Sequence, residues 1–351
     1  PIVTDFLDKT QPATKSRKEV YNFIISELNE VKDKLRRDVA TPASYGKMTR
    51  GGAYMILAKM YLNAEVWNPE GGPKWAECIA VCDSIMAMPY IIESNWKTNF
   101  IPHNEVSKEA ILSAVFKAGA TGQQFNVAAY SLHQLDFIAL QLNRRGQNGI
   151  AAMPSFVRTF DTTDRRYSGS FLIGPMIDPA TGSIIMTAHN RPLIHTIDIT
   201  MYDSDSDGWG WVNQEDGARC YKWDFEPGLS TSMENDVHIF RLADVYLMKA
   251  EAILRSGGDN GTATMLINRI RSRAFSDPSD LLSSVTLNDI YKERGFELAW
   301  EGYSRQDRIR FGTFLLPNEF KPYASDSKYL LFPIPQTAID ANNKLIQNPG
   351  Y

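Results

Sequence analysis

The 351-residue chain contains 43% hydrophobic and 22% charged residues, as in an ordinary globular protein with one large domain or two fused domains. Its formal net charge of −4 argues against nucleic-acid binding, which requires a basic face toward the phosphates. No stretch of the sequence approaches the roughly 20 apolar residues of a membrane-spanning helix. Three cysteines cannot all pair with one another, and Cys78 and Cys82, four residues apart, are expected to be buried on one helical face.

The first helical region is predicted from residue 16 to residue 86. Ser16 and Glu19 have the spacing of a capping box, in which both side chains satisfy backbone N–H groups at a helix start. Apolar residues at helical spacing follow as far as Leu35. A second helix is predicted over residues 53–64 and a third from about Trp75 to Met86, separated by a loop rich in proline and glycine. Small alanines would let these two helices approach closely, as in a tetratricopeptide hairpin.

A second helical hairpin is predicted near the C-terminus. Its helices cover residues 241–255 and 262–274, separated by Gly257-Gly258, and a further helix covers 287–301, with Leu298 and Trp300 in the core. The residues between the two helical regions hold short apolar runs and many Gly, Asn and Asp turns. The predicted organisation is one compact unit with a helical scaffold (1–90), a mixed, loop-rich segment that carries the ligand face (91–239), and a helical scaffold with an extended tail (240–351).

Three passages in the last third of the chain resemble the SusD/RagB family. They are FRLADVYLMKAEA (240–252), INRIRSRA (267–274) and ERGFELAWEGYSRQDRIRFG (293–312), and their common order makes the resemblance more specific than any one of them. The stretches 19–35 and 45–67 also resemble the tetratricopeptide-like scaffold of this family. The resemblance implies a mainly α fold, in which tetratricopeptide-like hairpins pack with an irregular, loop-rich segment that contains short strands.

The same resemblance implies a non-enzymatic glycan-binding protein at the cell surface, on the outer membrane. Such a protein would capture oligosaccharides and hand them to a TonB-dependent, SusC-like transporter. Family members usually begin upstream with a signal peptide and a lipid-bearing cysteine, so contact with the membrane is expected only through a lipid anchor missing from this chain. No nucleic-acid partner and no cofactor other than calcium is expected, and a peptide ligand in place of a glycan stays open.

Three glutamates offer an alternative function. Glu293, Glu297 and Glu301 recur every four residues, and two of them would serve as the acid and the nucleophile of a glycoside hydrolase. The arginines that follow, from Arg294 to Arg310, favour an ion-paired structural cluster instead. The sequence contains no HExxH, G-x-S-x-G or P-loop motif. The remaining alternatives are therefore a glycoside hydrolase and a helical protein-interaction scaffold without a sugar ligand.

An acidic run in the mixed segment resembles the start of a calcium loop. Asp203, Asp205 and Asp207 alternate before Gly208, and such carboxylates supply the hard oxygen ligands that Ca²⁺ prefers. The twelfth position holds Gln214 rather than glutamate, which excludes a standard EF-hand. The run is therefore either a weak calcium site or a solvated acidic turn.

The ligand face is expected to lie in two parts of the mixed segment. The resemblance places part of it in residues 130–151, ahead of the pair Asp164-Arg165. Tryptophans after the acidic run would either stack on a sugar ring or fold onto the body of the protein. Amides and guanidinium groups suit sugar hydroxyls, although each such residue can also be an ordinary polar loop residue. The candidate ligand-binding residues are Tyr130, Asn143, Arg144, Gln147, Asn148, Trp209 and Trp211.

Overall fold

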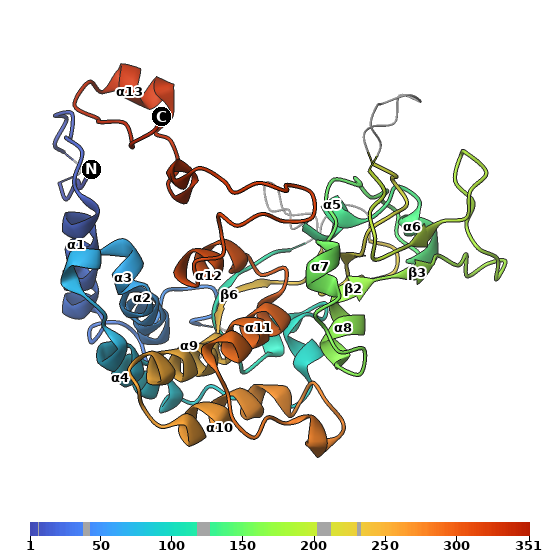
Figure 1. Ribbon diagram of the computed structural model, residues 1–351, viewed down its shortest axis with the longest axis horizontal. Coiled ribbons are helices and arrows are strands. Elements are labelled where there is room, and N and C mark those ends of the chain that lie inside the picture. The colour runs from blue at the N-terminus through green and yellow to red at the C-terminus, as the bar shows by residue number, and fades with distance from the viewer. Residues whose placement is uncertain (6, 38–42, 118–126, 202–211, 230–232) are drawn as a thin grey trace.

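The structure is a computed structural model, and it describes residues 1–5, 7–37, 43–117, 127–201, 212–229 and 233–351. Helices predominate in these ranges, and the strands are short, which confirms the predicted mainly α fold (Figure 1). The helical scaffold occupies one side of the molecule and the mixed segment the other. Among the described residues, every helix is too short or too polar to cross a lipid bilayer.

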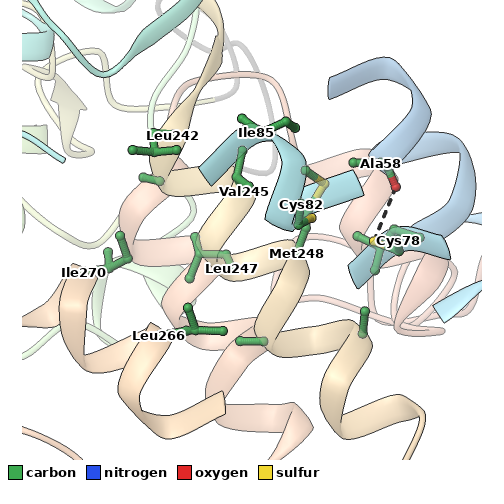
Figure 2. Close-up of a cluster of buried hydrophobic side chains, with 14 of the residues drawn as sticks. Ala58, Cys78, Cys82, Ile85, Leu242, Val245, Leu247, Met248, Leu266 and Ile270 are labelled. Carbon is green, nitrogen blue, oxygen red and sulfur yellow. Dashed lines mark hydrogen bonds between the residues drawn. The ribbon is translucent and has the colours of Figure 1, made fainter. Parts of the chain in front are cut away.

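The N-terminal helices form as the sequence predicts. Helix α1 (Arg17–Val31) starts at the Ser16 capping box, in which the Ser16 side chain accepts from the Glu19 N–H and Glu19 accepts from the Ser16 N–H. Helix α2 (Arg50–Leu62) packs antiparallel to α4 (Trp75–Met86), with the short helices α3 (Ala64–Trp67) and η1 (Pro69–Gly71) between them. Cys78 and Cys82 are buried and unpaired, and the Cys78 thiol donates to Ala58 O at 3.6 Å (Figure 2).

The C-terminal helices complete the same core. Helix α9 (Leu242–Arg255) lies against α4, α10 (Asn260–Arg271) and α11 (Leu287–Leu298). Val245 and Met248 of α9 meet Cys82 and Ile85 of α4 in one hydrophobic cluster, as Figure 2 shows. Helix α10 begins two residues earlier than predicted because the Asp259 side chain accepts from two N–H groups of its first turn. The two helical regions of the sequence therefore share one core.

Helix α11 ends three residues before the predicted position. Its last carbonyls are satisfied by buried cations: Lys222 Nζ donates to Glu297 O at 2.8 Å and to Ala299 O at 2.7 Å, and Arg241 also donates to Glu297 O. Trp300 follows with φ of 67°, in the left-handed region that side chains rarely adopt. Leu298 is buried as predicted, but Trp300 is only half-buried, and its indole N–H donates to Ser170 O at 3.0 Å.

Where the structure describes the mixed segment, it contains short helices and three two-stranded antiparallel sheets. Strand β1 pairs with β6, β2 with β5, and β3 with β4. Trp223 is buried in a cluster with Trp96 and Phe100. The elements are η2 (Trp96–Asn99), η3 (Asn104–Val106), β1 (Ala110–Ala114), α5 (Val127–Ser131), α6 (Asp136–Ala139), α7 (Pro154–Val157), α8 (Arg165–Ser170), β2 (Phe171–Leu172), β3 (Gly174–Pro175), β4 (Ile194–His195), β5 (Arg219–Cys220) and β6 (Val237–Arg241).

The C-terminal tail differs from the extended chain that the sequence predicts. Beyond η4 (Pro278–Asp280) and α11 the chain forms α12 (Ser304–Arg310), η5 (Ser327–Leu330) and α13 (Gln336–Ala341). Helix α13 starts directly after Pro335, because a proline is tolerated at a helix start. The tail then reaches the N-terminal segment, where Asn342 Nδ2 donates to Pro12 O at 2.9 Å (Figure 1). It therefore joins the two ends of the described chain rather than covering the body.

Candidate ligand-binding face

Residues 129–149 and 212–229 form the surface that we call the ligand face. Its outer loop, 143–149, lies tightly against the end of α5. Gly146 is buried there, and a Cβ at this position would lie 2.2 Å from Leu132 O, so no side chain fits. Three backbone hydrogen bonds of 2.7–3.0 Å join the segments, from the N–H groups of Gln147, Asn148 and Gly149 to the carbonyls of Ala129, Leu132 and Tyr130 respectively.

Two of the predicted amides help to hold this loop in place. The Asn143 backbone N–H donates to Leu229 O at 2.8 Å, and its side-chain amide donates to Gly228 O at 3.0 Å. Asn148 adopts φ of 52°, which asparagine tolerates better than most residues. The Oδ1 atom of Asn148 is buried without a hydrogen-bond partner among the described residues. Asn143 therefore positions the loop, whereas Asn148 keeps an unused acceptor.

The structure brings five of the seven predicted ligand residues together. Tyr130 is 49% exposed, and Gln147 is exposed beside the half-buried Arg144 and Asn148. Trp209 and Trp211 lie outside the described residues, as do Asp203, Asp205 and Asp207 of the predicted calcium loop. Within the described ranges, no three His, Cys, Asp or Glu side chains come together as a metal site requires.

A shallow pocket opens beneath the loop, and sequence reasoning missed most of it. Arg144, Arg145 and Gly146 form one side of the pocket. The other lining residues are apolar and come from segments far apart in the sequence: Ala129, Leu132, Leu142, Phe225, Leu229 and Met233. No local pattern in the sequence indicates that the 225–233 segment would meet the 142–146 loop.

A buried histidine–carboxylate cluster supports the ligand face from below. His195 Nε2 lies 2.8 Å from Asp136 Oδ1, and its Nδ1 lies 2.8 Å from Glu215 O. The other carboxylate oxygen of Asp136 accepts from the His133 N–H at 2.7 Å. Burial lowers the pKa of His133, which favours its neutral form. His133 is thus a supporting residue of the face rather than a surface group.

Glu293 and Glu297 of α11, together with Glu301 just beyond the helix, belong to a buried ion-pair network that joins the scaffold to the mixed segment. Glu297 accepts hydrogen bonds from Arg166 (3.0 Å), Arg241 (2.6 Å) and Arg273 (2.7 Å), all of them buried. We call the whole set the joint network; its carboxylates equal its cations in number. The members are Glu109, Asp164, Glu293, Glu297 and Glu301 with Arg166, Lys222, Arg241, Arg271 and Arg273.

The electrostatics of the joint network fit a structural role. Burial opposes the charged form of Glu297, but Arg273, Arg241 and Arg166 outweigh it and lower its pKa. Glu109 likewise has its pKa lowered to about 2 by Arg273 and Arg241 against the opposing effect of burial. A general acid of a glycoside hydrolase needs the opposite shift. The geometry therefore confirms the structural interpretation of the glutamates.

The arginines expected to pair with these glutamates pair elsewhere. Arg294 donates to Asp244 and Asp307, and Arg310 donates to Glu251 and Asp307. Arg305 donates to backbone carbonyls of the tail. The predicted local ion pairs are wrong because Arg294 and Arg310 meet carboxylates of α9 and α12 instead.

The geometry described so far is that of a helical scaffold that carries a loop-built face. Residues 199–325 match the model of the SusD family. The starch-binding protein SusD of Bacteroides thetaiotaomicron is 25% identical over 97% of this chain and 67% of its own length. The SusD-like protein P25 of Formosa agariphila is 25% identical over 87% of this chain and 60% of its own length. This chain thus spans about two thirds of the length of these curated relatives.

Solved structures share the fold. A SusD homologue from Bacteroides thetaiotaomicron superposes with a TM-score of 0.73 at 20% identity, over 98% of this chain and 72% of that one. Surface glycan-binding protein A from the same species, in complex with laminarihexaose, gives a TM-score of 0.68 at 20% identity, over 94% of this chain and 70% of that one. The chain is therefore similar to SusD proteins in sequence, and it shares their fold over nearly its whole length.

Proposed function

We propose that this protein captures oligosaccharides on the ligand face. The observation that carries the proposal is the clamped 143–149 loop, which is tied to the end of α5 by backbone hydrogen bonds and leaves Tyr130 and Gln147 exposed on one surface. A face already fixed by backbone hydrogen bonds loses little further freedom when a ligand binds. The names of the relatives support the choice of ligand, since they include a starch-binding protein and a glycan-binding protein in complex with laminarihexaose.

Delivery to a membrane transporter is the second part of the proposal. The protein would be held by a lipid anchor at the outer membrane and would pass its glycan to a TonB-dependent, SusC-like transporter without hydrolysing it. The similarity to the SusD family supports this arrangement. Copurification with such a transporter tests the partnership, and prolonged incubation with oligosaccharides should release no new reducing ends.

Substitution of one exposed ring tests the site. Tyr130→Ala should weaken oligosaccharide binding by about 1–3 kcal/mol, because a ring stacked on a flat ligand contributes about that much. Asn143→Ala should weaken oligosaccharide binding by about 1 kcal/mol, because the loss of one hydrogen bond costs about that much. Titration calorimetry with laminarihexaose and with starch oligosaccharides measures both effects.

The tail offers a matched control for the tyrosine. Tyr323 is 68% exposed and lies outside the ligand face, so Tyr323→Ala should leave the affinity unchanged. If the parent binds and Tyr130→Ala behaves like Tyr323→Ala, the site lies elsewhere. If the parent binds no oligosaccharide, the proposed function itself is wrong.

A further inference from the structure

We propose that the pocket beside Arg144 and Arg145 selects glycans that carry an anionic group, either a uronate carboxylate or a sulfate ester, over their neutral counterparts. The inference rests on the proposed function, because it names the ligand class of the same face. It depends on three features: the apolar pocket wall, the position of the arginines, and the engagement of the other charged groups around them.

The pocket has an apolar wall in which Phe225 and Leu229 are only partly buried and can contact the carbon face of a sugar. Leu142, Phe225, Leu229 and Met233 line it, and the two arginines stand next to this apolar surface. A guanidinium beside an apolar wall loses part of its hydration when a ligand covers it, and that loss is unfavourable unless an opposite charge or hydrogen bonds replace the water. An anionic substituent on the sugar supplies both.

Arg145 is available for such a substituent. Its guanidinium lies over the Phe137 ring, 5.8 Å from the centroid, and Arg145 is exposed. Among the residues that the structure describes, it forms no ion pair and no side-chain hydrogen bond. Gly146 and the backbone hydrogen bonds of the 143–149 loop fix its backbone beside the pocket. The cation is therefore held at the ligand face without a protein counter-charge.

The other cations around the ligand face are already engaged. Arg219 donates to the carbonyls of Gln214 and Asp216, and Arg191 pairs with Glu215 at 3.3 Å. These two arginines stabilise the fold of the ligand face, so they have fewer free hydrogen-bond donors for a ligand than Arg145 has.

The nearby carboxylates do not neutralise the arginine. Both oxygens of Asp136 are used within the histidine–carboxylate cluster. Glu226, on the loop that faces 143–149, is exposed and forms no ion pair with any cation that the structure describes. An anionic ligand therefore meets a positive group, and the planar guanidinium can bind a carboxylate or sulfate through two parallel charge-assisted hydrogen bonds.

Paired oligosaccharides that differ only in charge test the inference. One pair is an oligogalacturonide and its methyl ester; the second is a sulfated galactan oligosaccharide and its desulfated form. We expect the anionic member of at least one pair to bind about tenfold more tightly, the effect of one or two charge-assisted hydrogen bonds. Added salt should reduce this ratio, and the pair that shows it identifies the anion.

Arg145→Gln should reduce the anionic-to-neutral ratio to within about twofold, because one charge and its paired donors are lost. Arg269→Gln is the matched control: it removes the same charge from an exposed position on α10. Unchanged melting temperatures would show that both variants are folded. Equal affinity for charged and neutral forms, or a preference that survives Arg145→Gln, overturns the inference and leaves the proposed function standing. Absence of binding to every oligosaccharide overturns both.

Discussion

The joint network and the ligand face place arginine in opposite circumstances. Arg166 is fully buried, and its guanidinium is shared among Asp164, Glu293 and Glu297. Arg145 is exposed above an apolar pocket and has no carboxylate partner among the described residues. A buried charge is tolerated only when it is paired and hydrogen-bonded, whereas an exposed charge can stay hydrated until a ligand binds. The same residue type therefore fixes the fold in one region and remains available for recognition in the other.

The largest expected effect comes from breaking the joint network. Glu297→Gln should lower the free energy of unfolding by about 3–5 kcal/mol, because it leaves three buried arginines without their shared carboxylate. Chemical denaturation measures the loss. Glu30→Gln on α1 is the control: Glu30 and its partner Lys34 are both exposed, so its cost should stay below about 0.5 kcal/mol. Similar costs for the two variants would contradict the structural role.

The pH dependence of stability should depend on His238, a second buried group, which lies on the strand that carries Arg241 of the joint network. Burial, with Arg241 adding to it, lowers the pKa of His238 on β6 to about 4. Between its ordinary value of 6.5 and about 4, the unfolded chain binds a proton that the folded chain excludes. Stability should therefore fall as pH decreases through this window, by at most about 3 kcal/mol from this residue.

Melts at pH values on either side of the window test the histidine prediction. His238→Gln should flatten the curve. Part of the dependence should remain, since burial also lowers the pKa of His133 under the ligand face. The carboxylates with lowered pKa, such as Glu109, lose their contribution as pH falls below the ordinary glutamate value of 4.5, so the effect of His238 is measured above that pH. An unchanged slope in His238→Gln would contradict the assignment.

Two substitutions of Trp300 distinguish the effect of side-chain packing on stability from the effect of backbone strain at the end of α11. Because the indole is only half-buried, Trp300→Ala should cost about 2 kcal/mol, below the roughly 3–5 kcal/mol of a fully packed tryptophan. Trp300→Gly should be less destabilising than alanine by up to about 1 kcal/mol, since glycine accepts the observed φ of 67° without strain. Thermal or chemical denaturation ranks the two, and a glycine variant weaker than the alanine variant would refute the strain argument.

The smallest expected effect concerns calcium binding by the acidic run. If Asp203, Asp205 and Asp207 bind Ca²⁺, the few ligands predict a weak, millimolar affinity. The melting temperature should then differ slightly between calcium and chelator. Asp205→Asn should remove that difference. Identical melts for the parent would leave the run as a solvated acidic turn.

Local patterns in the sequence predicted the scaffold well. The capping box at Ser16, the helical spacing of apolar residues and the Gly257-Gly258 stop all act over a few residues, and the structure follows them. The family resemblance likewise placed Tyr130 and the 143–148 residues on one surface, although the ligand itself remains a prediction. Signals of this kind require no knowledge of what lies far away in the chain.

Long-range contacts explain what the sequence did not predict. Arg166 and Glu293 are 127 residues apart, and no pattern near either identifies the other as its partner. Helix α11 ends early because Lys222, from the mixed segment, satisfies its last carbonyls. The pocket depends in the same way on a meeting of Leu142 with Leu229 and Met233. Such features are contacts between segments that lie far apart in the sequence, and neither helix propensity nor motif spacing predicts them.

The equal numbers of carboxylates and cations in the joint network have an evolutionary consequence. Loss of one member leaves its opposite buried and unpaired, so single substitutions are strongly disfavoured and paired ones are tolerated. Across relatives, positions such as Glu109 and Arg273, or Glu293 and Arg166, should therefore vary together. The 143–149 loop contributes no member to the joint network, so its residues should vary more freely, while the covarying positions mark the joint network in sequences that share little else.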